Sequence, residues 1–462
     1  MHQSPTDPRP RVLHLTQPVD GGVARVVTDL TRAQLAAGWR VAVACPGGTP
    51  LADALTALGA DVRPWDAGRS PGPSLAGEVR RLARLVAEVA PDLVHAHSAK
   101  AGLAGRLAVR GRIPTVFQPH AWSFEAVGGV TGALAVRWER WAARWTAHTV
   151  CVSEAERRRG ARAGIRGPSA VVPNGVDTAR FRPTAAAPGA PSVLAAPGAP
   201  GAPSVLTAPA EPAVLAAPSA LAAPAERAEP AAPPAPGAVG SPLPGPAPAT
   251  PPPPVAPSAR SRLLPGVDPA APWVVCVGRL CPQKGQDLLL RAWDTVLRRV
   301  PGARLVLVGD GPDRDRLRAL APGSVAFAGA VADPVPWYRA ADLVVLPSRW
   351  EGMALAPLEA MACGRPVVLS DVDGARESLP PSLAPHCLVP PRDPDALAAA
   401  VTALLLDPPL RASLGARGRR HVLSTHDVRH TTRAVAALYR DLLGTVPVTS
   451  VAPTECREPI PS

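Results

Sequence analysis

The sequence predicts an α/β protein in which two doubly wound parallel-sheet domains face each other across a cleft. Short apolar runs alternate with helical patterns in both halves of the chain, as expected for β-α-β units. A proline-rich segment separates the two halves. In such sheets ligands bind beyond the carboxyl ends of the strands, so the chemistry is expected there.

The strands are predicted from apolar runs bounded by turn residues. In the first half these runs are Val12–Thr16, Arg40–Cys45, Leu93–His97, Thr115–Gln118, Thr149–Ser153 and Ala170–Pro173. In the second half they are Trp273–Val277, Arg304–Val308, Val325–Phe327, Leu343–Leu346 and Pro366–Leu369. Helical periodicity between them predicts helices such as Ala24–Ala37, Leu75–Val89, Gln286–Arg299, Asp313–Leu320, Leu355–Cys363 and Pro394–Leu406.

Composition divides the chain into five parts. Residues 184–258 hold 22 of the 61 prolines and repeat the hexamer GAPSVL. This segment cannot bury enough apolar surface to offset its ordering entropy, so a disordered linker is expected, with a site for a proline-recognising domain as the alternative. The linker separates a first domain, 1–183, from a second, 259–426. A terminal crossover helix, 427–443, and a flexible tail, 444–462, complete the chain.

The overall composition favours a cytoplasmic protein. Of 462 residues, 47% are apolar and 19% charged, and no long apolar run is free of charge and proline. The polar start argues against a signal peptide. The net charge is +12, with +10 in residues 1–183, which favours phosphorylated substrates or anionic lipid. No nucleic-acid-binding signature is present, and seven scattered cysteines predict no disulfide framework.

Two histidines and two lysines need interpretation. His95 and His97 lie in an apolar run, where two side chains on opposite faces of a strand are favoured over a metal site. Only Lys100 and Lys284 are lysines among 49 basic residues, which suggests sites that need a compact point charge.

Glycine-bearing turns follow several strands at the same predicted edge of each sheet. Such turns let backbone approach a phosphate, or serve turn geometry alone. Arg279 and Lys284 follow one strand, and could either hold a diphosphate or be solvated surface cations. The glycines concerned are Gly21, Gly22, Gly278, Gly309 and Gly311.

The most informative segment runs from Pro347 to Val368. Glu351 follows an apolar strand, and Glu359 lies eight residues later within an apolar helix. A carboxylate in such a helix requires partners, which sugar or ribose hydroxyls would supply, or it is a structural anchor bonded to backbone.

This segment resembles the E-x7-E signature of retaining glycosyltransferases of the GT-B fold, in particular family four. Further matches occur in the same order along the chain: Gly21–Gly22, His120, Ser153, Pro173–Asp177 with Phe181, Val277–Leu280 with Lys284–Gly285, and Gly309–Pro312. The resemblance implies a hexosyltransferase that moves a sugar from a nucleoside-diphosphate sugar, its co-substrate, without a metal or a resident cofactor.

The resemblance also implies residue roles. The catalytic set is His120, Arg279, Lys284 and Glu351, with the two cations on the diphosphate, His120 facing the reacting sugar and Glu351 on its hydroxyls. Glu359 binds the ribose. The remaining donor-binding positions are Gly278, Gly309, Gly311, Gly352, Met353, Ala354 and Leu355, and the acceptor or phosphate positions are Gly21, Gly22, Lys100, His120, Ser153 and Asn174.

Retention of the anomeric configuration can come from a double displacement or from front-face attack guided by the leaving phosphate. Front-face attack is preferred, because the sequence offers no evident enzymic nucleophile. Arg25 stands where family members often have an acidic residue, and Ala121-Trp122 follows His120 where many have glycine or aspartate. Two rivals stay open: a GT-B sugar-nucleotide epimerase and a non-catalytic sugar-nucleotide-binding partner of another enzyme.

The stretch His97–Arg106, together with Phe117–Phe124, resembles a subset of the family that builds bacterial polysaccharides on lipid-diphosphate carriers, so a glycan or a polyprenyl-diphosphate-linked acceptor is expected. Trp138, Trp141 and Trp145 recur beside three arginines on a predicted helix. They would either dock on an anionic membrane, placing the protein at the inner face of the cell membrane, or pack against the sheet.

Overall fold

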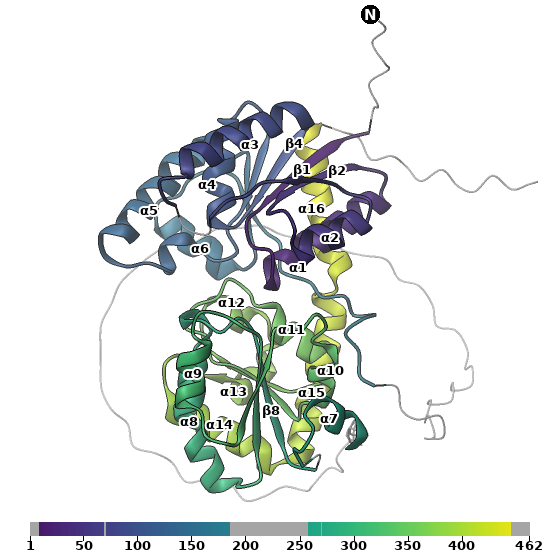
Figure 1. Cartoon of the computed structure of the whole chain (residues 1–462), viewed down its shortest axis with the longest axis vertical. Coiled ribbons are helices and arrows are strands. Elements are labelled where there is room, and N and C mark those ends of the chain that lie inside the picture. Colours follow the sequence, from purple (N-terminus) through teal and green to yellow (C-terminus); the bar gives the residue numbers. More distant parts are fainter. Residues whose placement is uncertain (1–8, 69–70, 185–256, 269, 445–462) are drawn as a thin grey trace, which may run out of the picture. The chain divides into compact units, whose positions relative to one another are not determined.

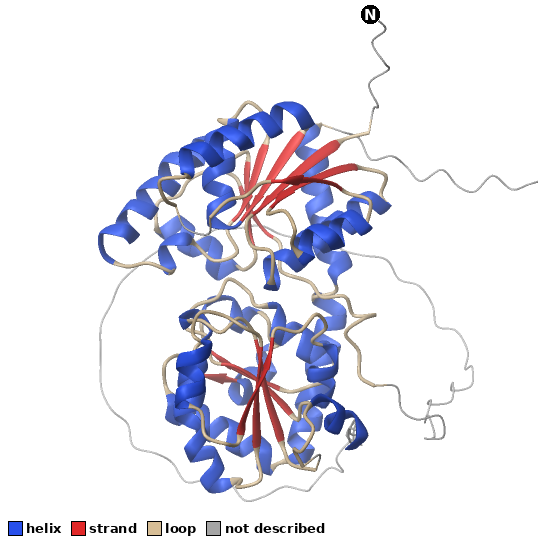
Figure 2. Ribbon diagram, in the orientation of Figure 1, coloured by secondary structure: helices blue, strands red, loops and turns tan. Residues whose placement is uncertain are grey.

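The computed structural model describes residues 9–68, 71–184, 257–268 and 270–444. The predicted linker and tail fall almost entirely outside these ranges. Within them the chain forms two α/β lobes, which belong to one compact unit of the chain. Each lobe has a parallel sheet with helices on both of its faces (Figures 1 and 2).

The first lobe is built on a seven-stranded sheet of order β3-β2-β1-β4-β5-β6-β7, in which all neighbours are parallel. The strands are β1 Arg11–Thr16, β2 Arg40–Cys45, β3 Asp61–Pro64, β4 Leu93–His97, β5 Thr115–Gln118, β6 His148–Cys151 and β7 Ser169–Val171. The helices are α1 Gly21–Ala36, α2 Pro50–Ala57, α3 Leu75–Val89, α4 Ser98–Val109, α5 Gly129–Ala142 and α6 Glu154–Arg162, with 3-10 turns η1 Ser123–Glu125 and η2 Ala143–Trp145.

The second lobe has a six-stranded parallel sheet of order β10-β9-β8-β11-β12-β13. Its strands are β8 Trp273–Val277, β9 Arg304–Val308, β10 Val325–Gly329, β11 Leu343–Leu346, β12 Val367–Ser370 and β13 Leu388–Val389. Its helices are α7 Pro257–Leu263, α8 Gln286–Arg299, α9 Arg314–Leu320, α10 Val335–Ala340, α11 Leu355–Ala362, α12 Asp373–Glu377, α13 Ala384–Cys387, α14 Pro394–Leu406 and α15 Pro408–Thr425, with η3 Pro282–Lys284 and η4 Pro381–Leu383.

Strand order fixes where ligands are expected. The chain order reverses between β1 and β4 in the first sheet and between β8 and β11 in the second. Ligands of doubly wound sheets bind beyond the strand ends at such switch points. The two candidate loops of the second lobe, 278–284 after β8 and 347–354 after β11, lie at this switch point.

The last helix, α16 Val428–Leu443, follows the second lobe in sequence but packs against α1 of the first. The Tyr439 hydroxyl lies 2.5 Å from Nδ1 of His95 on β4. The predicted crossover helix is therefore present, with its buried face against the first lobe.

All predicted strands are present, but the sequence analysis missed β3 and β13. Strand β3 is a four-residue edge strand with two exposed positions and an Asp-Val-Arg-Pro sequence, so it carries no apolar run. Strand β13 has only two residues. The expectation of no disulfide framework is consistent with the six described cysteines, which are all buried and free.

Candidate active site at the carboxyl ends of the strands

The loop after β8 is held against neighbouring loops by close backbone contact. Gly285 has a φ of +67°, and a Cβ there would lie 2.1 Å from the carbonyl oxygen of Pro347. Only glycine fits both the left-handed conformation and this approach. The turn places Lys284 beside the loop that follows β11, so two loops far apart in sequence form one surface.

The glycines after β9 are also required because another loop's backbone lies too close for a side chain. A Cβ at Gly309 would lie 2.1 Å from the carbonyl oxygen of Gly278, and one at Gly311 would lie 2.3 Å from that of Leu280. The Leu280 amide donates to the Asp310 carbonyl at 2.9 Å. Loop-to-loop packing therefore accounts for these glycines, and their predicted contact with the donor stays a prediction.

Lys284 and Glu351 form an ion pair. The Lys284 Nζ lies 2.5 Å from Glu351 Oε1, which also accepts from Ser348 Oγ at 2.7 Å. Glu351 is only 6% exposed, so these two donors offset much of the cost of burying its charge. The structure brings together two of the predicted catalytic residues, and adds Ser348, which the sequence analysis missed.

A small pocket opens beside this pair. It is lined by Ser348, Glu351, Ala354 and Ser370, with apolar side chains from β11, β12 and α12. Neither Lys284 nor Arg279 lines this pocket. Lys284 is next to it because it pairs with Glu351, which is a lining residue.

Glu359 lies in α11 with two partners. Its Oε2 accepts from the Tyr338 hydroxyl at 2.7 Å, and its Oε1 pairs with the Arg25 guanidinium from α1. Glu359 is 3% exposed, which confirms the expectation that this carboxylate is buried and needs partners. Burial raises the pKa of Tyr338 and lowers that of Arg25. Arg25, noted as a departure from the family pattern, thus contacts the residue expected to bind ribose.

The amino end of α11 offers unused backbone donors. Its N-cap, Ala354, has no side chain that can accept from the first turn, so several amides lack intrahelical partners. A Cβ at Gly22, where α1 begins, would lie 3.7 Å from Leu355 Cδ1. Two helix amino ends thus meet here, and both dipoles favour an anion. Met353 is fixed by Asn174, whose Nδ2 donates to its carbonyl at 2.7 Å.

Arg279 has spare donor capacity. Its side chain is half-buried, and its Nε is buried without a hydrogen-bond partner. No carboxylate of the described residues pairs with its guanidinium, whereas most arginines in this lobe have such a partner or bond to a carbonyl. A buried, unsatisfied guanidinium nitrogen is costly unless a ligand satisfies it.

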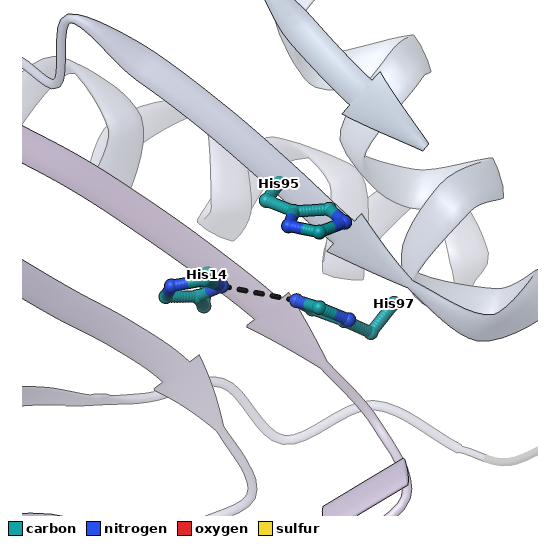
Figure 3. Close-up of side chains that lie close together, drawn as sticks. All are labelled: His14, His95 and His97. Carbon is teal, nitrogen blue, oxygen red and sulfur yellow. Dashed lines mark hydrogen bonds between the residues drawn. The ribbon is translucent and has the colours of Figure 1, made fainter. Parts of the chain in front are cut away.

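Four histidines of the first lobe form a chain of contacts, and Figure 3 shows three of them, His14, His95 and His97. His14 Nε2 lies 2.8 Å from Gln34 Oε1, and His14 Nδ1 lies 3.0 Å from His97 Nε2. His97 Nδ1 lies 3.3 Å from Nε2 of His120. Burial lowers the pKa of His14 to about 4 and of His120 to about 3, and those of His95 and His97 well below 6.5. The imidazoles are therefore neutral near pH 7.

The prediction that His95 and His97 lie on opposite faces of a strand was wrong. Residues two apart in a strand point to the same face, and the centres of the two rings lie 3.9 Å apart with their planes tilted by 35°. Nitrogens of His14, His95 and His97 lie within 4.8 Å of one another, so this trio is where a metal ion could bind among the described residues. The expectation that the protein needs no metal stays a prediction.

The backbone at His120 is unusual because His120 and Ala121 both have positive φ, 56° and 87°. Glu156 holds this conformation: its Oε1 accepts from the Ala121 amide at 2.6 Å, and its carbonyl accepts from Trp122 Nε1 at 2.8 Å. Burial raises the pKa of Glu156 to about 7. The sequence analysis missed Glu156, although a glutamate three residues after the predicted Ser153, the spacing of a helix capping box, was a usable signal.

Two predicted acceptor residues have structural partners. Lys100 pairs with Glu78 at 2.6 Å, and both side chains are almost fully buried. Ser153 caps α6 by accepting from the Glu156 amide at 3.1 Å. The positive charge of Lys100 is thus neutralised within the protein, so the geometry gives no support to its predicted phosphate contact.

Comparisons with known proteins agree with this architecture. The family model described as Glycosyltransferase Family 4 matches residues 20–180, and that described as Glycosyl transferases group 1 matches residues 271–407. In solved structures, Anabaena HepE with UDP-glucose superposes with a TM-score of 0.68 at 20% identity, covering 93% of this chain and 99% of that chain. Sucrose-phosphate synthase from Thermosynechococcus elongatus gives 0.67 at 21%, covering 94% and 100%. These structures support the GT-B fold.

Curated relatives match over part of the chain. The GDP-mannose-dependent alpha-(1-6)-phosphatidylinositol monomannoside mannosyltransferase of Mycobacterium tuberculosis is 40% identical over 165 residues, 33% of this chain and 43% of its own. The lipopolysaccharide core biosynthesis mannosyltransferase LpcC of Rhizobium leguminosarum bv. viciae is 35% identical over 181 residues, 37% and 51% of the two chains. The chain thus spans about half, or less, of the length of the curated relatives it matches.

Proposed function

The chain belongs to glycosyltransferase family 4, and from that premise we propose that it transfers a hexosyl group from a nucleoside-diphosphate sugar to a glycan or lipid-linked acceptor. We propose further that the transfer retains the anomeric configuration and needs no metal. The observation that carries the proposal is the convergence of the Lys284–Glu351 pair with the amino end of α11 at the β8/β11 switch point. This is where a doubly wound sheet binds a nucleotide.

The proposal assigns the diphosphate to Arg279, Lys284 and the amides of α11. Arg279 has an unsatisfied nitrogen, and α11 has uncapped amides, so both have unused donors. Glu351 keeps Lys284 in place and presents its second oxygen to the transferred sugar. Glu359, held by Tyr338, is assigned the ribose hydroxyls, which must then compete with Arg25 for its Oε1.

The reaction breaks the bond between the anomeric carbon and the diphosphate oxygen and forms a bond from that carbon to an acceptor hydroxyl oxygen. Negative charge develops on the departing diphosphate, where cations and helix amides stabilise it best. In front-face attack the acceptor proton passes to the departing phosphate oxygen. Trapping of a glycosyl-enzyme adduct would instead establish a double displacement.

His120 is assigned to the sugar. Its pKa of about 3 keeps the ring neutral, so it offers one donor and one acceptor nitrogen rather than a charge. Its Nε2 faces His97, which leaves Nδ1 for a substrate hydroxyl. The dipole of a neutral imidazole can orient a hydroxyl without attracting a second phosphate.

The relatives suggest which substrates to try first. Two of them are named mannosyltransferases, one GDP-mannose-dependent and acting on a phosphatidylinositol mannoside, the other in lipopolysaccharide core biosynthesis. A solved structural neighbour binds UDP-glucose. We therefore place GDP-mannose and UDP-glucose first among donors, and lipid-linked glycans, polyprenyl diphosphates included, first among acceptors. The proposal places the enzyme in the cytoplasm, at the inner face of the cell membrane.

A donor panel tests the proposal. UDP-, GDP- and ADP-sugars are screened for a rise in the thermal midpoint and for release of nucleoside diphosphate, since a ligand of the native state stabilises it by mass action. One donor should both stabilise and be hydrolysed slowly. Stabilisation without any release would favour a non-catalytic binding partner, and conversion of the sugar nucleotide to its epimer would establish the epimerase. A panel with no hit at all would contradict the proposal.

A further inference from the structure

One helix of the first lobe carries a concentrated exposed apolar surface. Large apolar side chains that are exposed in the described ranges are few, and four of them lie in or beside α5. These are Val127, Val130, Leu134 and Trp141, exposed by 39%, 78%, 61% and 41%. Apolar side chains gathered on one surface usually mark an interaction site.

The spacing of these residues makes them a stripe. At about 100° per residue, Leu134 and Trp141 lie roughly 40° and 20° from Val130 around the axis of α5. Arg137 falls on the same line, roughly 20° to the other side. Trp138 and Trp145 lie off this stripe and are half-buried. They contact Trp141 at ring-centroid distances of 5.4 and 4.3 Å. Of the three tryptophans that the sequence predicts to contact a membrane, only Trp141 is therefore exposed enough to do so.

The charge of this face has one sign. Arg137, Arg140 and Arg144 are exposed, and the Arg144 guanidinium lies 4.6 Å from the centre of the Trp141 ring. The only carboxylate between residues 126 and 147 is Glu139, which is 1% exposed and pairs with Arg106 at 2.8 Å. Exposed α5 therefore presents apolar groups and cations with no anion among them.

We propose that the exposed face of α5 and of the turn η2 that follows it, defined by Val130, Leu134, Arg137, Trp141 and Arg144, docks on an anionic phospholipid surface. Apolar side chains flanked by arginines suit the membrane–water interface. The apolar side chains enter the boundary of the acyl chains, while the guanidinium groups reach the lipid phosphates. An acidic protein surface would complement the arginines but not the apolar ridge as well. The helix lies in the plane of the interface. None of the helices in the described ranges is by itself long and apolar enough to cross a bilayer; only α14 and α15 taken together, bent by 103°, meet that criterion.

Docking here has a consequence for the reaction, which rests on the proposed function. Turn η1 begins three residues after His120 and packs against α5. A bilayer at α5 would hold a lipid-linked acceptor close to the loop of His120, so membrane binding would raise the local acceptor concentration.

Vesicle flotation of the full chain tests the docking. Vesicles of phosphatidylcholine alone are compared with vesicles containing 30% phosphatidylglycerol, at low and at high salt. The wild-type protein should float with the anionic vesicles and be released by salt. The double variant Leu134→Ser, Trp141→Ser should lose at least tenfold in partitioning. Replacing Arg137 and Arg144 by Gln should lose about thirtyfold, since each arginine near an anionic surface contributes a factor of about five.

The chain offers matched controls. Leu320 and Leu406 are each 58% exposed but lie in α9 and α14 of the second lobe, so Leu320→Ser and Leu406→Ser should leave flotation unchanged. Circular dichroism and the thermal midpoint verify that each variant folds.

Absence of flotation with anionic vesicles would overturn the docking proposal, as would equal losses in the controls. Self-association that the α5 double variant abolishes, without vesicle binding, would identify a second copy as the occupant. Donor hydrolysis in solution should not change in any of these variants, so failure of the docking and failure of the proposed function are distinguishable.

Discussion

The buried histidines make the protein sensitive to acid by an amount that can be worked out for one residue. In the unfolded chain His14 takes up a proton below pH 6.5, but in the folded protein it does so only near pH 4. Stability is therefore full above pH 6.5 and falls as the pH falls toward 4. At pH 5, protonation of His14 in the unfolded chain lowers the free energy of unfolding by about 2 kcal/mol, because this fully buried group stays mostly neutral in the folded protein.

The variant His14→Gln removes this contribution to the pH dependence of the unfolding free energy. Urea unfolding followed by circular dichroism at pH 7.5 and pH 5 gives the change in unfolding free energy for each protein. The wild type should lose about 2 kcal/mol more between the two pH values than the variant does. The comparison is made within each protein, so any constant cost of the substitution cancels. His430→Gln, at an exposed histidine, should lose as much as the wild type. Equal pH dependence in His14→Gln and the wild type would refute the reasoning.

Three further predictions concern the second lobe. Lys284→Met should fold but lower kcat by about a hundredfold to a thousandfold, because the departing diphosphate loses a positioned cation; an unchanged kcat would remove Lys284 from the mechanism. Tyr338→Phe leaves Glu359 without its hydroxyl donor and should lower the unfolding free energy by about 1–3 kcal/mol in urea titrations, whereas a neutral result would mean that the bond is not made. Gly309→Ala should lower the thermal midpoint by several degrees, because its φ is +138° and its Cβ would contact backbone, whereas Gly302→Ala, which has open space, should not; equal midpoints would refute the packing argument.

The fold could be predicted from the sequence because its main signals are local. Buried parallel strands read as apolar runs, and the central strands β1, β4, β8 and β11 are buried along nearly their whole length. Edge strand β3 carries no such signal, since its polar residues face solvent. Helix α15 carries a similarly weak signal, because its buried residues are two glycines and two single aliphatic residues, Leu414 and Val422.

The candidate site could be predicted in part, because the residue types were visible but their partners were not. Glu359 stood out as a carboxylate in an apolar helix, yet its donor Tyr338 is 21 residues away and Arg25 is in the other lobe. Lys100 stood out as a rare lysine, and only the fold shows that Glu78 pairs with it. The contact between His95 and His97 was predictable from the two-residue period of a strand, and the error lay in applying that period wrongly.

The most direct test of diphosphate binding in the second lobe is calorimetric titration with UDP and GDP, each compared with its monophosphate. The wild type should bind one of the diphosphates at least tenfold more tightly than the corresponding monophosphate, and Arg279→Gln should abolish most of that preference. Arg298→Gln, an exposed arginine at the far end of α8, should preserve it. Equal affinity of the wild type for diphosphate and monophosphate, or an unchanged preference in Arg279→Gln, would contradict the account.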